Sequence, residues 1–301
     1  MAQSASALRW GTLAAITATL IWSGNLLIAR FLHADIPPVA LATYRWIIAT
    51  LALLPIAWPM LFKQRREVAR HWRFLLPLSL LGVSGFNTFI YIASEHASAL
   101  KMALMAISFP LFTLIFSRIR YGTLIRPLQI WGLCLVLIAA TALIFDGDWS
   151  KALSLEWHNS DAWMITAAVS FAIYSMMLPY QPNSLHPLTT LLATFIIGTL
   201  CLLPLFLIEG LSVPEYQITP QAWASIAYIG VFASLVAYWL WNQAVAQIGA
   251  LQAGFCYYLL PVFAGVLGAL WLDEPLGWFH GLCALTMVIG LGLIQWRNRR
   301  D

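Results

Sequence analysis

The chain has 301 residues, of which 61% are hydrophobic and only 9% are charged, and its formal net charge is +4. With a mean hydropathy of +0.80 it has too little polar surface to cover a water-soluble globule of this length. The pI near 9.0 reflects where the basic residues lie around a membrane, and it gives no case for a nucleic-acid partner. Composition therefore excludes a soluble globular protein and predicts an all-α integral membrane protein.

Ten runs of 18 or more apolar residues follow one another along the chain, each long enough as a helix to cross a hydrocarbon core of about 30 Å. They lie at roughly 10–31, 39–62, 74–94, 99–117, 127–145, 161–180, 187–208, 220–242, 250–270 and 276–296. The connecting segments leave no room for a soluble domain, and we find no Walker-type glycine loop that would hold a nucleotide. The first run lacks a convincing cleavage site, so we expect it to remain as the first membrane helix.

Lysine and arginine are distributed unevenly between the loops. If the N-terminus is cytoplasmic, twelve of the sixteen basic residues fall on the cytoplasmic side. Loops rich in lysine and arginine are retained on the cytoplasmic side of the membrane. We therefore expect both termini in the cytoplasm and the protein in the inner membrane of a bacterium.

The two halves of the chain resemble each other. The segment 47–55 matches 196–204 at a constant offset of 149 residues, including the proline that ends each block. This predicts two repeats, residues 1–150 and residues 151–301, with five spans each. An odd number of spans inverts the second repeat in the membrane, and inverted repeats place a substrate site near the midplane.

Polar side chains recur at helical spacing inside several spans, where they must face a partner helix or water. In the first half the stripes are Ala15, Ala18, Trp22, Asn25 and Ala29; Ser84, Asn87, Tyr91 and Ser94; and Lys101, Met105, Ser108 and Phe112. In the second half the polar and aromatic positions are Ser170 and Tyr174; Ser234, Tyr238, Trp241 and Asn242; and Tyr257 and Tyr258. Pro110 and Pro261 occupy equivalent places, so we expect both fourth helices to be bent or unwound there.

These stripes predict a nearly uncharged pocket lined by rings, whose polar tips suit an amphipathic ligand. The candidate substrate-binding residues are Trp22, Asn25, Asn87, Tyr91, Lys101, Ser108, Tyr174, Tyr238, Trp241 and Tyr257. The alternative for any one of them is an ordinary hydrogen bond between helices.

Few ionisable residues lie at membrane depth. We expect Arg45 to extend to the outer boundary or to pair with Asp35 rather than to bind substrate. Glu95 and His96 flank an outer turn, where they either pair in water or couple transport to protons. The cysteines and histidines show no metal-ligand spacing, and the span interiors contain no carboxylate pair for hydrolysis. We expect no metal, no cofactor and no enzymatic activity.

The ten spans, the paired prolines and the closing segment Leu270-Trp271-Leu272-Asp273-Glu274-Pro275-Leu276, followed by Gly281 and Gly290, carry a family resemblance. The chain resembles the EamA family of the drug/metabolite transporter superfamily, and more narrowly its bacterial YddG-type aromatic amino-acid exporters. The resemblance implies a basket of helices around a central cavity, with spans 5 and 10 at the periphery. The acidic-proline segment occurs only once, since the first half reads Arg118-Ile119-Arg120-Tyr121-Gly122 at that place.

The sequence favours export of amino acids, aromatic and other neutral ones first, by alternating access. Efflux of other small metabolites or of organic cations is the alternative within transport, although cation pumps need a membrane-embedded carboxylate that the first span lacks. A membrane enzyme or a receptor is the alternative from another class. We expect a monomer whose partners are the small-molecule substrate and membrane lipid.

Overall fold

The computed structural model describes residues 5–32, 35–97, 99–122, 126–154, 156–213, 216–271 and 277–295, and all regular elements in these ranges are helices. The acidic-proline segment at 272–276 lies outside the described residues. The α-helices are α1 (Ala5–Leu32), α2 (Pro38–Lys63), α3 (Arg65–Arg70), α4 (Trp72–Ser79), α5 (Phe86–Ser94), α6 (Ala99–Ala106), α7 (Phe109–Tyr121), α8 (Pro127–Ile144), α9 (Trp149–Leu153), α10 (Asn159–Met177), α11 (Pro187–Ser212), α12 (Pro220–Tyr228), α13 (Ala237–Cys256), α14 (Leu260–Trp271) and α15 (Trp278–Gln295). Between them lie the π-helical segments η1 (Leu80–Gly85) and η3 (Ile229–Val236) and the 3₁₀ segments η2 (Leu178–Tyr180) and η4 (Tyr257–Leu259).

Eight helical stretches of the described chain are long and apolar enough to cross a membrane, and α15 adds a shorter apolar helix. One of the eight, Pro220–Leu270, has 51 residues and would measure about 75 Å as a single helix, more than twice the hydrocarbon core. Gly249 interrupts it inside α13 with φ 80° and ψ 157°, an extended backbone with positive φ that glycine tolerates. The stretch is therefore divided at Gly249.

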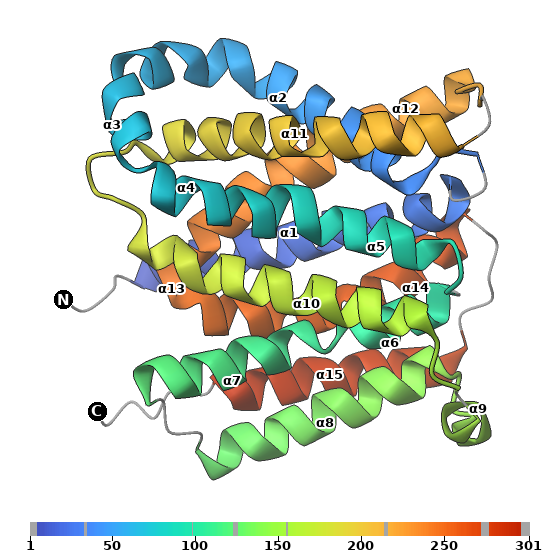
Figure 1. Ribbon diagram of the computed structural model, residues 1–301. Helices are drawn as coiled ribbons and strands as arrows, with labels where there is room; N and C mark the ends of the chain where they lie inside the picture. The colour runs from blue at the N-terminus through green and yellow to red at the C-terminus, as the bar shows by residue number, and fades with distance from the viewer. Residues whose placement is uncertain are drawn as a thin grey trace.

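Helices from the first half pack on helices from the second half throughout the bundle. Helix α1 lies along α13, α2 along α11, α10 along α5 and α7, and α8 along α15. The last pair forms the lower edge of the bundle in Figure 1, away from α2 and α11, in agreement with the peripheral place that the family resemblance implies for spans 5 and 10. Two glycines bring α8 and α15 together: a Cβ on Gly132 would lie 2.6 Å from the carbonyl oxygen of Gly290.

The helix axes are interrupted at corresponding places in the two halves. Each third span contains a π-helical segment, η1 or η3, whose wider turn leaves carbonyl groups without their usual i+4 partner. Each fourth span is broken beside its proline: α6 ends and α7 begins next to Pro110, and η4 precedes Pro261. The expected breaks at Pro110 and Pro261 are confirmed.

Helix α1 begins and α15 ends at the same end of the bundle, on the left of Figure 1. The basic helix α3 (Arg65–Arg70) and the end of α7, which carries Arg118 and Arg120, lie at this end too. Basic residues thus gather at one end of the helices, as the unequal loop charges predict.

Candidate functional site

Seven aromatic side chains meet where the two halves of the chain join. We call them the ring cluster: Trp22, Phe109, Phe171, Tyr174, Tyr238, Trp241 and Tyr257, each at most 5% exposed. Phe171 of α10 is its hub, with its ring centroid 5.2 Å from that of Trp22, 5.1 Å from that of Phe109 and 5.4 Å from that of Trp241. Helices α1 and α7 of the first half and α10, α13 and the η4 turn of the second half all contribute rings.

The ring cluster fills the place for which the sequence predicts a ring-lined pocket. Trp22 contacts Tyr238 edge-on, with centroids 5.7 Å apart, and Phe109 contacts Tyr257 at 5.0 Å, so the rings pack on one another. This is a closed arrangement of the centre. The interruptions at Gly249, beside Pro110 and at η4 lie in the helices that carry these rings.

Polar groups at the edges of the ring cluster are satisfied by hydrogen bonds, two of them between the halves and two within the second half. Asn87 donates from Nδ2 to the hydroxyl of Tyr238 at 3.1 Å, and Tyr238 donates to the carbonyl of Gly82 in η1. The other two donors are Tyr174, whose hydroxyl reaches Oδ1 of Asn242 at 2.9 Å, and Trp241, whose Nε1 reaches Oγ of Ser175 at 3.0 Å. These contacts fix the ring orientations.

Arg45 of α2 is fully buried beside the ring cluster, so the expectation that it reaches the outer boundary or pairs with Asp35 is wrong. Its Nη1 donates to Oδ1 of Asn25 at 2.9 Å and to the Tyr91 hydroxyl at 2.7 Å, and its Nε donates to Oγ of Ser234 at 2.6 Å. Nη2 donates to the carbonyl of Ala233 at 3.0 Å. We call Arg45 with these four partners the arginine site.

The π-helical segment η3 explains why the second half can receive this arginine. Ser234 donates its hydroxyl to the carbonyl of Ile229 at 2.8 Å and still accepts from Arg45. The carbonyl of Ala233 accepts from both Arg45 and Nε1 of Trp22, the latter at 2.8 Å. A carbonyl shared by Arg45 and Trp22 joins the arginine site directly to the ring cluster.

Seven of the ten candidate residues lie in these two groups: Trp22, Asn25, Tyr91, Tyr174, Tyr238, Trp241 and Tyr257. An eighth, Asn87, is buried beside them and bonds to Tyr238. The polar stripes of spans 1 and 3 are buried as predicted. Phe109, Phe171 and Arg45 were missed as candidates. A Phe in an apolar helix has no signal that separates a core position from a lipid-facing one, whereas an arginine inside a span does carry such a signal.

The other two candidates lie apart from these groups. Lys101 forms an ion pair with Asp161 at 2.8 Å and donates to the carbonyl of Glu156 at 2.6 Å, so it joins α6 to the start of α10. Ser108 donates to the carbonyl of Met105 at 2.6 Å within the break of span 4. The predicted stripe that contains both residues is only half-buried, because the buried face of span 4 lies one position away from it and includes Phe109.

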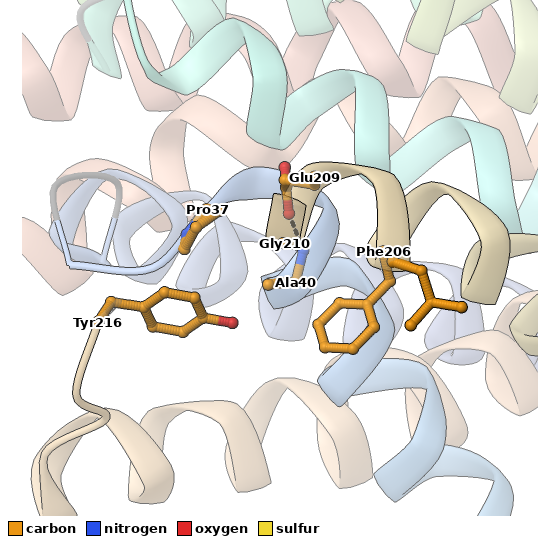
Figure 2. Close-up of a pocket in the computed structure, with 7 residues that line it drawn as sticks. Pro37, Ala40, Phe206, Glu209, Gly210 and Tyr216 are labelled. Atoms are coloured by element: carbon orange, nitrogen blue, oxygen red, sulfur yellow. Dashed lines mark hydrogen bonds between the residues drawn. The ribbon is translucent and has the colours of Figure 1, made fainter. Parts of the chain in front are cut away.

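A pocket of about 220 Å³ opens where α2 begins and α11 ends (Figure 2). Glu209 of α11 lines it, and its two carboxylate oxygens accept from the backbone N–H groups of Val39 at 3.0 Å and Ala40 at 2.7 Å. Pro38 at the start of α2 has no N–H, so Glu209 satisfies the next two free donors of that helix and favourably places a negative charge at its N-terminus.

Beside this carboxylate, the hydroxyls of Tyr44 and Tyr216 are 3.1 Å apart. Burial is the main cause that raises the pKa of Tyr216, which lies between the spans, so its hydroxyl stays protonated at neutral pH. The Glu209 cap holds α2 against α11, and the tyrosine pair holds α2 against the segment after α11, at the end of the bundle opposite the start of α1.

The described ranges contain no group of three or more His, Cys, Asp or Glu side chains that would hold a metal ion. Glu95 and His96 are exposed in the turn that follows α5.

Comparison with known protein families matches residues 9–145 and 158–296 separately to the EamA-like transporter family. "Uncharacterized transporter YyaM" of Bacillus subtilis is 23% identical and covers 88% of this chain and 86% of its own. A "Probable terminal-alkyne amino-acid exporter" of Streptantibioticus cattleyicolor is also 23% identical, over 87% of this chain and 86% of its own. One solved crystal structure superposes with a TM-score of 0.74 at 19% identity, over 96% of this chain and 97% of its own, which shows the same fold.

Proposed function

Since the chain belongs to the EamA-like transporter family, with one copy of the domain in each half, we propose that it is a secondary exporter of amino acids, aromatic and other neutral ones first. It is a membrane transporter and not an enzyme. The observation that carries the choice of substrate is the ring cluster joined to the arginine site. Rings suit an aromatic or aliphatic side chain, and the adjoining amide, hydroxyl and guanidinium groups suit the polar end of an amino acid.

We further propose that the described helices form ten spans in two inverted repeats, residues 1–150 and residues 151–301. The division of Pro220–Leu270 at Gly249 supports two crossings there, and α15 supplies a further crossing. The corresponding π-helical segments and proline breaks of the two halves support the repeat. The basic end of the bundle, where α1 begins, is the cytoplasmic face in this proposal.

Transport then proceeds by alternating access, and the closed ring cluster is the occluded arrangement. The contact of Glu209 with α2 keeps the periplasmic end shut, and opening of that end releases the solute. The protein acts as a monomer, because each pair of repeats encloses its own pathway.

Organic cations are a weaker candidate class. The centre of the bundle carries the positive charge of Arg45, and within the described residues the buried Asp161 is already paired with Lys101. A fixed positive charge in a low-dielectric centre repels a cation. The name of the Streptantibioticus cattleyicolor relative, an amino-acid exporter, also favours the amino-acid class.

Counterflow into proteoliposomes with a panel of labelled amino acids tests the proposed function. We expect flux of phenylalanine and tryptophan. This flux should fall strongly in Trp241→Ala, because that change removes a fully buried ring and leaves the hydroxyl of Ser175 without its hydrogen-bond donor. Ser108→Ala serves as the matched control, since Ser108 bonds only within its own turn. Absence of phenylalanine and tryptophan flux while another class of solute moves would overturn the proposal.

A further inference from the structure

Among the described residues, the buried charge of the arginine site has no fixed counter-ion. Arg45 is 0% exposed, and its four hydrogen-bond acceptors are an amide, two hydroxyls and a carbonyl, all neutral. Throughout the described parts of the chain, no carboxylate oxygen forms an ion pair with it within 4.0 Å. A guanidinium keeps its charge in proteins, so the site has a net charge of +1.

Such a charge is costly unless something offsets it. Removing an ion from water is costly even after the surroundings relax. The rings of Trp46 at 5.3 Å and Tyr91 at 5.9 Å offset part of this cost, because the face of an aromatic ring attracts a cation. The remaining cost is expected at a site that binds a mobile anion, and it is unexpected at a purely structural link between helices, for which neutral side chains suffice.

The surrounding groups are able to change partners. Asn25 Oδ1 accepts both from Arg45 and from the Tyr91 hydroxyl, the latter at 3.0 Å, so an arriving carboxylate can take its place on Nη1. The hydroxyls of Tyr91 and Ser234 are then free to turn and donate to the same carboxylate. Guanidinium and carboxylate form short, charge-assisted and often bidentate hydrogen bonds, about twice as strong as neutral ones.

From this geometry we propose that Arg45 is the anchor for the carboxylate of the transported solute, a deduction that rests on the transport function proposed above. The Ala233 carbonyl shared by Arg45 and Trp22 places the anchor next to the ring cluster. The solute is therefore a carboxylic acid that carries an aromatic or apolar group. The arginine site offers no carboxylate for an ammonium group, so the site selects for the acid and tolerates loss of the amine.

Competition against labelled phenylalanine counterflow by the wild-type protein tests this selectivity without any mutation. Phenyllactate, which lacks the amine, should compete within about threefold of phenylalanine. Phenylalaninamide and phenethylamine, which lack the carboxylate, should compete at least tenfold less well. Equal competition by phenylalaninamide and phenylalanine would overturn the anchor.

Variants of Arg45 give a second, independent measurement. Arg45→Gln should raise the half-saturating phenylalanine concentration at least tenfold and remove the preference for the acid over the amide. Arg45→Lys keeps a positive charge, so it should retain part of the phenylalanine affinity and part of the preference for the acid. Arg65→Gln is the matched control, because Arg65 is exposed and bonds to the Phe62 carbonyl in its own segment. Unchanged half-saturation and unchanged preference in Arg45→Gln would refute the anchor, and if that variant does not fold, the wild-type competition decides.

The two proposals fail in distinguishable ways. If the wild-type protein moves no labelled amino acid, the proposed substrate class is wrong. The anchor is then judged by thermal stabilisation of the purified protein, in which phenyllactate must raise Tm more than phenylalaninamide does. If amino acids move but the acid is not preferred, the proposed function stands and the anchor is wrong.

Discussion

Gly82 makes room for a ring of the site, and replacing it with alanine tests how tightly the centre is packed. A Cβ on Gly82 would lie 2.3 Å and 2.5 Å from two ring carbons of Tyr174. That ring cannot move aside easily, because it stacks on Phe171 with centroids 5.5 Å apart and its hydroxyl is bonded to Asn242. Overpacking of this kind costs about 1–3 kcal/mol.

The assay is thermal unfolding of purified Gly82→Ala in detergent, followed by counterflow. For a chain of this size the cost should lower Tm by roughly 2–10 °C, and phenylalanine transport should fall because Tyr174 is displaced. Gly281→Ala is the matched control: nothing lies within 4 Å of a Cβ there, so the change should stabilise α15 by up to about 1 kcal/mol. If Gly82→Ala unfolds within 1 °C of the wild type, the central packing described above is wrong.

Three further predictions follow from the contacts around the site. Glu209→Ala leaves the N–H groups of Val39 and Ala40 without their acceptor, which should lower the free energy of unfolding by about 1–3 kcal/mol. The change should also increase thiol labelling of an Ala40→Cys reporter. Unchanged labelling would contradict a closing role for Glu209. Asp161→Ala leaves Lys101 without its buried carboxylate and should lower the free energy of unfolding by about 3–5 kcal/mol, measured by thermal or denaturant unfolding. A loss below about 1 kcal/mol is typical of exposed ion pairs. Such a small loss would show that the pair is not buried in the membrane-embedded protein. Reporter tags on the two chain ends should both be found in the cytoplasm, and opposite locations would refute the inverted repeat.

The local pattern of the sequence predicted much of the fold. Apolar runs, prolines and basic loops are local signals, so the membrane class, the broken fourth helices at Pro110 and Pro261 and the clustering of charge at one end could all be read from them. The repeat was visible because two segments kept the same residues at one offset. The stripes of spans 1 and 3 were also correct, because their polar positions stay on the buried face, in span 3 even where the π-helical segment η1 ends.

The pattern failed where the inner face of a helix is mostly apolar or where partners are distant in sequence. In span 4 the buried face lies one position away from the stripe through Lys101, so that stripe was only half-buried and Phe109 was missed. Arg45 looked like a boundary residue, because the acceptors that bury it come from three other helical segments, and two of them, Ser234 and the Ala233 carbonyl, are nearly 190 residues away.

The sequence by itself determined that this chain is a membrane protein of helices in two related halves with a basic end. The tertiary structure decided which side chains meet: the seven rings, the buried arginine with its neutral partners and the carboxylate of Glu209 on the first turn of α2. In an apolar helix both the lipid-facing and the partner-facing sides are hydrophobic, so periodicity cannot tell them apart. That choice depends on long-range packing and on π-helical turns that expose a carbonyl, and both exist only once the helices are assembled.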